Sequence, residues 1–378
     1  MFDQRYRKKL DHQRLTGLFR DPLAVEEKNG RFIRVEGRDI LNFASNDYLG
    51  LAADPAVRKQ VARNFATLGP SASSSRLVTG NHSVIRNAEL KFAQYFGYED
   101  ALFFPSGFQA NMAVLSTLFG KGDSIFFDKH IHASSIKGMA LSSADFFGYK
   151  HNAPDHLKRR LQTKGEGPKA LITEALFSMD GDTPDIKALV ELKKEFNLLC
   201  VVDEAHSFGV LGKGGRGIGR DLADVAVGTL GKAFGLFGAF VLLPSLYRDY
   251  LINFSSPLIY TTSLPEAQAQ SAADILDRVE SADGKREYLQ DLRNLFVRKA
   301  IDKGFRVKGE AHILSITIGN EQKSLALARR LFEKGIFVFP ARYPTVPLGQ
   351  AILRISLSSL LEEEDVFRLI NEIAACGI

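Results

Sequence analysis

The sequence is poor in cysteine, with only Cys200 and Cys376 among 378 residues. Two cysteines in unrelated contexts exclude a disulfide framework and a cysteine-based metal site. The apolar runs are also short, since all of them fall below the roughly 18 consecutive residues that a membrane-spanning helix needs. The first residues lack the apolar stretch of a secretory signal peptide. We therefore expect a cytoplasmic protein that has no metal site and no membrane partner.

Features that would assign a nucleic-acid or nucleotide function are missing as well. The net charge of +5 is spread along the chain, and no basic module with interleaved aromatic residues is recognisable. Asp203-Glu204-Ala205-His206 is similar to a helicase motor motif, but no phosphate loop of the form G-x-x-x-x-G-K-[ST] precedes it. The glycine-rich run 212–217 lies in mid-chain, not after a first strand, so it is interpreted as a loop. No nucleic-acid partner is expected.

The pattern of helices and strands predicts the fold class. Between about residues 84 and 243, helical patterns alternate with short runs of strand length, among them residues 124–128, 169–174 and 225–229. Such alternation predicts an α/β fold with a mostly parallel central sheet. From about residue 279 the pattern changes to that of a small α+β domain. The expected organisation is an N-terminal segment of residues 1–45, a large domain of residues 46–278 and a small C-terminal domain of residues 279–378.

One lysine, Lys232, stands among glycines and apolar residues within residues 228–235, directly after a predicted strand. These neighbours argue against an ordinary solvated surface lysine. In an apolar niche the pKa of a lysine falls, and its amine can form an imine with an aldehyde. The pattern therefore indicates a lysine that carries an aldehyde.

Two further features fit the same chemistry. Ser106-Gly107-Phe108 follows a predicted strand and opens a helix, where free backbone N–H groups bind anions. Asp203 ends a buried apolar strand, which is where α/β sheets place ligand groups. Pyridoxal phosphate needs an anion site for its phosphate, a carboxylate for its ring nitrogen and a lysine for its aldehyde. The sequence thus predicts this cofactor.

Taken together, the motifs resemble those of the α-oxoamine synthase family of fold-type-I pyridoxal-phosphate enzymes. The resemblance extends over nearly the whole chain, from residues 42–50 to residues 353–356. The motifs that carry it are residues 128–134, 177–182, 203–206, 229–232, 261–265 and 343–347. It implies a fold-type-I transferase with its cofactor in the large domain.

The resemblance also implies roles around the cofactor. His132 is expected to stack on the ring, Asp203 to pair with the ring nitrogen and Lys232 to hold the aldehyde. Ser178 and His206 are expected to hydrogen-bond the phenolic oxygen. The residues expected at the phosphate are Ser106, Gly107, Phe108 and Thr229. The residues expected to reach the phosphate of a neighbouring subunit, which would make the enzyme a homodimer, are Thr261, Thr262 and Ser263.

Substrate contacts follow from the same resemblance. Asn46 and Arg354 are expected to bind the carboxylate of the amino acid, and a planar guanidinium suits this role because it binds carboxylate through two hydrogen bonds. Arg20 is expected near the far end of the acyl chain. Two departures stand out, namely residues 69–76 in place of a glycine-rich segment and Leu360-Leu361 where many members have a histidine.

The implied reaction is a decarboxylative condensation of a small amino acid with an acyl thioester, either acyl-CoA or acyl carrier protein. Lys232 is expected to be the base that removes the Cα proton. The motifs favour the subgroup that joins L-alanine to a pimeloyl thioester in biotin synthesis. Glycine C-acetyltransferase and 5-aminolevulinate synthase remain alternatives, since they share the catalytic residues. A scaffold relative without activity is disfavoured because Lys232 and Asp203 are both present.

Overall fold

The computed structural model describes residues 2–376, which divide into two compact units. The large unit comprises residues 54–178 and 183–283. The small unit comprises the chain up to residue 53, residues 179–182 and the chain from residue 284 onward. The N-terminal segment therefore groups with the C-terminal part of the chain.

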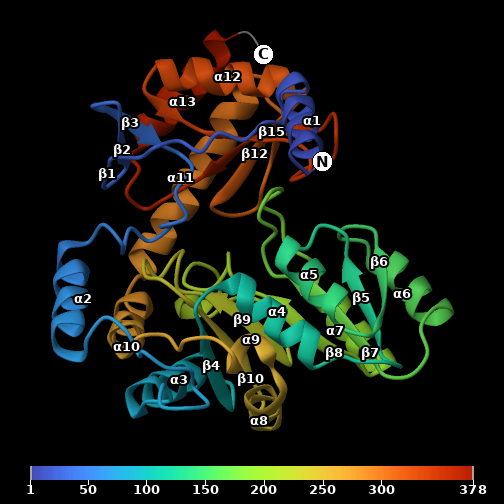
Figure 1. The fold of residues 1–378 in the computed structure, drawn as a ribbon. Helices are drawn as coiled ribbons and strands as arrows, with labels where there is room; N and C mark the ends of the chain where they lie inside the picture. Colours follow the sequence, from blue (N-terminus) through green and yellow to red (C-terminus); the bar gives the residue numbers. More distant parts are fainter. Residues whose placement is uncertain (1, 377–378) are drawn as a thin grey trace. The chain divides into compact units, whose positions relative to one another are not determined.

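The large unit is built on a sheet of seven strands in the order β4-β10-β9-β8-β7-β5-β6 (Figure 1). The strands are β4 (Asp100–Phe104), β5 (Ser124–Asp128), β6 (Asp145–Tyr149), β7 (Lys169–Glu174), β8 (Leu199–Asp203), β9 (Val225–Thr229) and β10 (Ala239–Leu243). All neighbouring pairs from β9 to β6 are parallel, whereas β10 runs antiparallel to both β4 and β9. The prediction of a mostly parallel central sheet in an α/β fold is confirmed.

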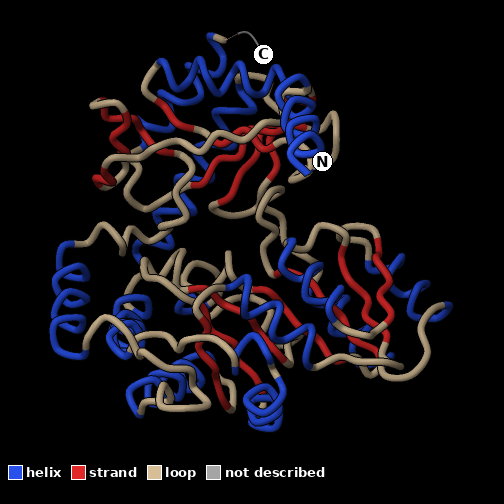
Figure 2. Tube along the Cα trace, viewed as in Figure 1, coloured by secondary structure: helices blue, strands red, loops and turns tan. Residues whose placement is uncertain are grey.

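Helices cover this sheet, as Figure 2 shows by blue coils around the red strands. They are α2 (Pro55–Leu68), α3 (Ser83–Phe96), α4 (Gly107–Thr117), α5 (Ala133–Leu141), α6 (Pro154–Thr163), α7 (Ile186–Phe196), α8 (Ser245–Phe254), α9 (Ser256–Ile259) and α10 (Glu266–Glu280). Helix α3 packs on β4 and β10, and α4 packs on β9 and β10 and against α5. The central strands are buried on both faces, which explains their nearly continuous apolar sequences.

The strand ends determine where functional side chains meet. Glu174 is the last residue of β7, Asp203 of β8 and Thr229 of β9. Because these strands are parallel and Glu174 is the register partner of Asp203, their carboxyl ends lie at one edge of the sheet. Ligands of open α/β sheets bind at such an edge.

Among residues 2–376, the small unit contains two four-stranded sheets and four helices. One sheet has β1 (Glu27–Asn29), β2 (Phe32–Val35), β3 (Arg38–Asn42) and β13 (Ile336–Phe337); the other has β11 (Val307–Lys308), β12 (Ile313–Gly319), β15 (Ala351–Ser356) and β14 (Phe339–Ala341). The helices are α1 (Phe2–Leu15), α11 (Asp283–Asp302), α12 (Glu321–Glu333) and α13 (Glu363–Ala375). The parallel pair β3–β13 joins the N-terminal segment to the C-terminal part. Within residues 2–376, no helix is both long and apolar enough to cross a membrane.

The glycine-rich run 212–217 is a loop that contains one 3₁₀ turn, η1 (Lys213–Gly215), and a buried carboxylate anchors the residues that follow it. Glu204 accepts hydrogen bonds from the Ser207 hydroxyl and from the N–H of Gly219, the latter at 2.6 Å. A Cβ atom at Gly217 or Gly219 would lie 2.6 or 2.7 Å from this carboxylate, so glycine permits the close approach. Burial raises the pKa of Glu204 to about 7. The glycines therefore surround a side chain of the protein itself.

Candidate active site

Lys232 lies in the loop after β9, partly buried between glycines and the fully buried side chains of Ala233 and Phe234. Its Nζ is 2.7 Å from Nε2 of His206, which lies in the turn after β8. The structure thus brings the proposed imine-forming lysine into direct contact with a residue expected at the cofactor.

Asp203 is almost buried, with 9% of its surface exposed. Its Oδ1 accepts the N–H of Ala205 at 2.9 Å, and its Oδ2 accepts a hydrogen bond from Asn111 Nδ2 at 2.7 Å. Asn111 lies on α4, so the helix that begins at Ser106 also orients this carboxylate. Asn111 was not among the predicted site residues, although it lies only five positions after Ser106.

His132 is the N-cap residue of α5 and has a solvent-accessible side chain. Its backbone N–H donates to Glu174 Oε1 at 2.5 Å, and its Nδ1 lies 2.7 Å from Ser134 Oγ. Partial desolvation lowers the pKa of the imidazole, and the charge of Lys232 lowers it further against the opposing effect of Asp203. The ring is therefore held in its neutral form near neutral pH.

Glu174 is a buried carboxyl group that the sequence interpretation overlooked. Burial raises its pKa well above the ordinary value, and the neighbouring charge of Asp203 raises it further. Its Oε1 accepts the N–H of His132, and the raised pKa favours the uncharged form of the carboxyl group beside Asp203. Its place at the end of an apolar strand is the same sequence signal that identified Asp203.

The N-terminus of α4 has the backbone geometry expected of an anion site. Ser106 is the N-cap residue and its Oγ accepts the N–H of Gln109 at 3.2 Å, which leaves the N–H groups of Gly107 and Phe108 in the first turn. Thr229 is adjacent, because a Cβ atom built on Gly107 would lie 3.9 Å from its Cβ. The four residues predicted to bind phosphate thus lie at the ends of β4 and β9, which β10 separates in the sheet.

The segment of Thr261, Thr262 and Ser263 runs beside residues 74–76. Ser75 and Thr262 form a β-bridge, and the N–H of Ser263 donates to Ser74 O at 2.9 Å. Thr262 is exposed, Thr261 is half-buried and Ser263 is buried.

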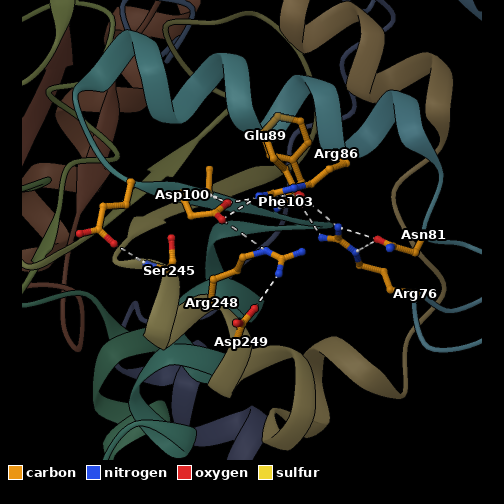
Figure 3. Close-up of polar contacts among 11 residues, drawn as sticks. Arg76, Asn81, Arg86, Glu89, Asp100, Phe103, Ser245, Arg248 and Asp249 are labelled. Carbon is orange, nitrogen blue, oxygen red and sulfur yellow. Dashed lines mark hydrogen bonds and ion pairs between the residues drawn. The ribbon is translucent and has the colours of Figure 1, made fainter.

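A network of arginines and acids fixes this region to the sheet (Figure 3). Arg76 Nη1 donates to Glu89 Oε1 at 2.5 Å, and the same oxygen accepts the N–H of Phe103 on β4 at 2.8 Å. Glu89 is fully buried on α3, and Arg86 of the same helix pairs with Asp100. The serine-rich residues that replace a glycine-rich segment are therefore held through Arg76.

The residues expected to bind substrate belong to the small unit. Ser178 and the other residues expected at the cofactor belong to the large unit. Tyr48 joins two of the residues expected to bind substrate, because its hydroxyl donates to Asn46 Oδ1 at 3.1 Å and accepts a hydrogen bond from Arg354. Arg354 also donates to Ser356 Oγ at 2.5 Å. Burial raises the pKa of Tyr48 to about 12, so the hydroxyl keeps its proton.

Arg20 is exposed in the segment after α1. Desolvation lowers the pKa of Arg342, and the charges of Arg20 and Arg329 lower it further, with Glu321 opposing. The structure thus places Arg20 in a positively charged region of the small unit.

The edge of the large sheet fits pyridoxal phosphate. A helix N-terminus has two backbone N–H groups available for phosphate, a nearly buried carboxylate ends β8, and a lysine contacts a histidine beside them. These are the three chemical groups that the cofactor requires.

Comparisons with known proteins agree with this site. A family model described as "Aminotransferase class I and II" matches residues 38–373. An 8-amino-7-oxononanoate synthase of Geobacter sulfurreducens is 37% identical over 97% of this chain and 96% of its own length. One of Aromatoleum aromaticum is 40% identical over 89% of each chain.

Solved structures show the same fold. A serine palmitoyltransferase of Sphingomonas wittichii has a TM-score of 0.92 and 28% identity, over 100% of this chain and 97% of its own. An 8-amino-7-oxononanoate synthase of Francisella tularensis has a TM-score of 0.77 and 35% identity, over 89% of this chain and 97% of its own. The chain belongs to the aminotransferase class I and II family and is a pyridoxal-phosphate-dependent C-acyltransferase of the fold-type-I class.

Proposed function

We propose that the enzyme condenses L-alanine with a pimeloyl thioester, of CoA or acyl carrier protein, to give 8-amino-7-oxononanoate for biotin synthesis. The observation that carries the proposal is the name shared by relatives of 37–40% identity that cover 89–97% of the chain. The residues of the two units are consistent with each part of this reaction.

The large unit provides the proton transfers. When bound, the cofactor supplies an electron sink that accepts the negative charge left on Cα. Asp203 would hold the proton of the ring nitrogen, while Ser106, Gly107, Phe108 and Thr229 would hold the phosphate. Lys232 Nζ, in contact with His206 Nε2 at 2.7 Å, is the base that removes the Cα proton. Ser178 and His206 would bind the phenolic oxygen.

The small unit supplies the cations for the substrate carboxylate. Arg354 is buried and hydrogen-bonded to Ser356 and Tyr48, which restricts its guanidinium to one orientation. Asn46 accepts a hydrogen bond from the same Tyr48 hydroxyl that contacts Arg354. We propose that Arg354 and Asn46 bind the carboxylate of alanine.

The charge around Arg20 supports an acyl chain that ends in an anion. A free carboxylate in an enclosed acyl site needs a cation, because a buried unpaired charge is costly. Desolvation lowers the pKa of Arg342, the charges of Arg20 and Arg329 lower it further, and Glu321 opposes them. We propose that Arg20 binds the far end of the pimeloyl group.

A homodimer is part of the proposal. Large apolar side chains are exposed directly before Thr261, within residues 74–78 and in the loop between β9 and β10: Tyr260 is 80% exposed, Val78 73%, Leu77 67% and Phe237 65%. Where exposed apolar groups form a contiguous patch, they mark a protein interface. Their position supports a second copy that completes the phosphate site with Thr261, Thr262 and Ser263.

A substrate panel tests the proposed reaction. Alanine, glycine and serine are each combined with acetyl-, succinyl-, pimeloyl- and palmitoyl-CoA and with pimeloyl carrier protein, and release of the free thiol is followed. Serine with palmitoyl-CoA belongs in the panel because a serine palmitoyltransferase has the same fold. Alanine with a pimeloyl thioester is expected to give the highest kcat/KM. A higher value for any other pair would refute the assignment.

A further inference from the structure

A chain of hydrogen bonds links the carboxylate of Asp203 to the ring of His132. Asn111 Nδ2 lies 2.7 Å from Asp203 Oδ2 and 3.0 Å from Ser134 Oγ. Ser134 Oγ in turn lies 2.7 Å from His132 Nδ1. Asn111 and Ser134 are buried, with 3% and 0% of their surfaces exposed, so protein groups satisfy these bonds.

The donor direction along this chain follows from the chemistry of its two ends. As a carboxylate, Asp203 offers only acceptors, so the atom facing it must be the N–H₂ group of Asn111. The second hydrogen of that group is donated to Ser134 Oγ, which lies at hydrogen-bond distance. With Oγ accepting from Asn111, the hydroxyl proton of Ser134 points to Nδ1 of His132.

A second donor meets the same ring nitrogen. The backbone N–H of Ser134, at the start of α5, donates to His132 Nδ1 at 3.3 Å. Two donors directed at Nδ1 require a lone pair there, and in a neutral imidazole the proton then resides on Nε2. Glu174 fixes the backbone of the same residue by accepting its N–H at 2.5 Å.

We propose that Asn111 and Ser134 are positioning residues that hold His132 as the neutral imidazole protonated at Nε2. The proposal concerns hydrogen bonds within the protein and does not depend on which amino acid or thioester the enzyme uses.

The fixed tautomer of His132 excludes this residue as the base that accepts the Cα proton. An imidazole whose only lone pair is occupied by two donors cannot accept the Cα proton. His132 is therefore an aromatic surface and an N–H donor, and Lys232 is left as the base. The surroundings of His132 agree with a neutral ring: desolvation lowers its pKa, Asp203 opposes this, Lys232 lowers the pKa further, and Glu174 contacts the backbone.

Nuclear magnetic resonance of the imidazole nitrogens tests the proposal directly. Histidine labelled with ¹⁵N is incorporated, and long-range ¹⁵N–¹H spectra are recorded for the holoenzyme and for protein from which the cofactor has been removed. His132 is assigned by its loss in His132→Gln. Both forms are expected to show a protonated Nε2 and an unprotonated Nδ1 at neutral pH.

Variants of the two positioning residues are expected to release the ring. Asn111→Leu removes the donor that fixes Ser134, so the hydroxyl can accept from Nδ1–H and both tautomers should appear. Ser134→Ala removes a hydrogen bond to the neutral ring, so the pKa of His132 should rise. Ser135→Ala, which removes the neighbouring buried hydroxyl on α5, is the matched control and should give the wild-type spectrum.

Two results would overturn the proposal. One is a wild-type His132 with its proton on Nδ1, and the other is a wild-type spectrum and titration in both Asn111→Leu and Ser134→Ala. Circular dichroism verifies folding, and because the two variants act on different bonds, loss of one to misfolding leaves the other as the test.

Discussion

Glu204→Gln should change how the stability of the enzyme depends on pH. In the folded protein, burial raises the pKa of Glu204 from its ordinary value of 4.5 to about 7. A raised pKa means that the folded state binds the proton more tightly than the unfolded state. The resulting stabilisation is complete below pH 4.5 and is lost as the pH rises through about 7.

The difference between these pKa values corresponds to about 3 kcal/mol, most of which is lost between pH 5 and pH 8. Glutamine cannot ionise, so Glu204→Gln removes this dependence and keeps the other titrating groups. For a folding unit of some 200 residues, the thermal midpoint of the variant relative to wild type should rise by roughly 5–10 °C over that range.

The assay is thermal unfolding of both holoenzymes by circular dichroism at steps between pH 5 and pH 8. Glu195→Gln is the control, because it removes a carboxylate from an exposed ion pair with Lys158, where effects are small. If the thermal midpoints of Glu204→Gln and wild type differ by the same amount at every pH, the pKa of Glu204 is not raised in the folded protein.

Four further outcomes are expected. Lys232→Ala should reduce turnover by several orders of magnitude, and borohydride reduction of the wild type should leave a pyridoxyl group on Lys232; an adduct on another lysine would refute the site. Asp203→Asn should retain the cofactor, by absorbance, but lose most of its activity, and near-normal turnover would exclude the proposed role of Asp203. Arg20→Ala should raise KM about tenfold for pimeloyl-CoA but not for octanoyl-CoA, with kcat unchanged and Arg14→Ala as control; an equal effect on both thioesters would contradict the role of Arg20. Sedimentation should show an active dimer that releases its cofactor on dissociation, and a stable active monomer would exclude the shared site.

The buried strands could be predicted from the sequence almost residue by residue. Residues 124–128, 169–174 and 225–229 form β5, β7 and β9 with those bounds, because their apolar runs are short and end at polar residues. β6 and α5 were not predicted. β6 contains a glycine and has exposed side chains, and α5 contains two serines and a glycine among nine residues, so neither has a clear periodicity.

The same distinction applies to the site. Lys232 and Asp203 are identifiable from their neighbours along the chain. The partners Asn111 and Ser134 become recognisable only when α4, α5 and β8 are brought together, since 92 residues separate Asn111 from Asp203. Tyr48 likewise meets Arg354 only through the fold of the small unit.

The reversed direction of β10 determines how the proposed catalytic lysine is held. A parallel strand after β9 would need a long crossover, whereas the antiparallel pairing of Thr229 with Ala239 makes residues 230–238 a closed hairpin loop. Leu230 N–H donates to Gly238 O at 2.9 Å, and Leu236 N–H donates to Leu230 O at 2.8 Å. The backbone on both sides of Lys232 is thus fixed by hydrogen bonds. The Nζ of Lys232 moves by rotation of four side-chain bonds, so it can leave one partner for another while the loop stays still.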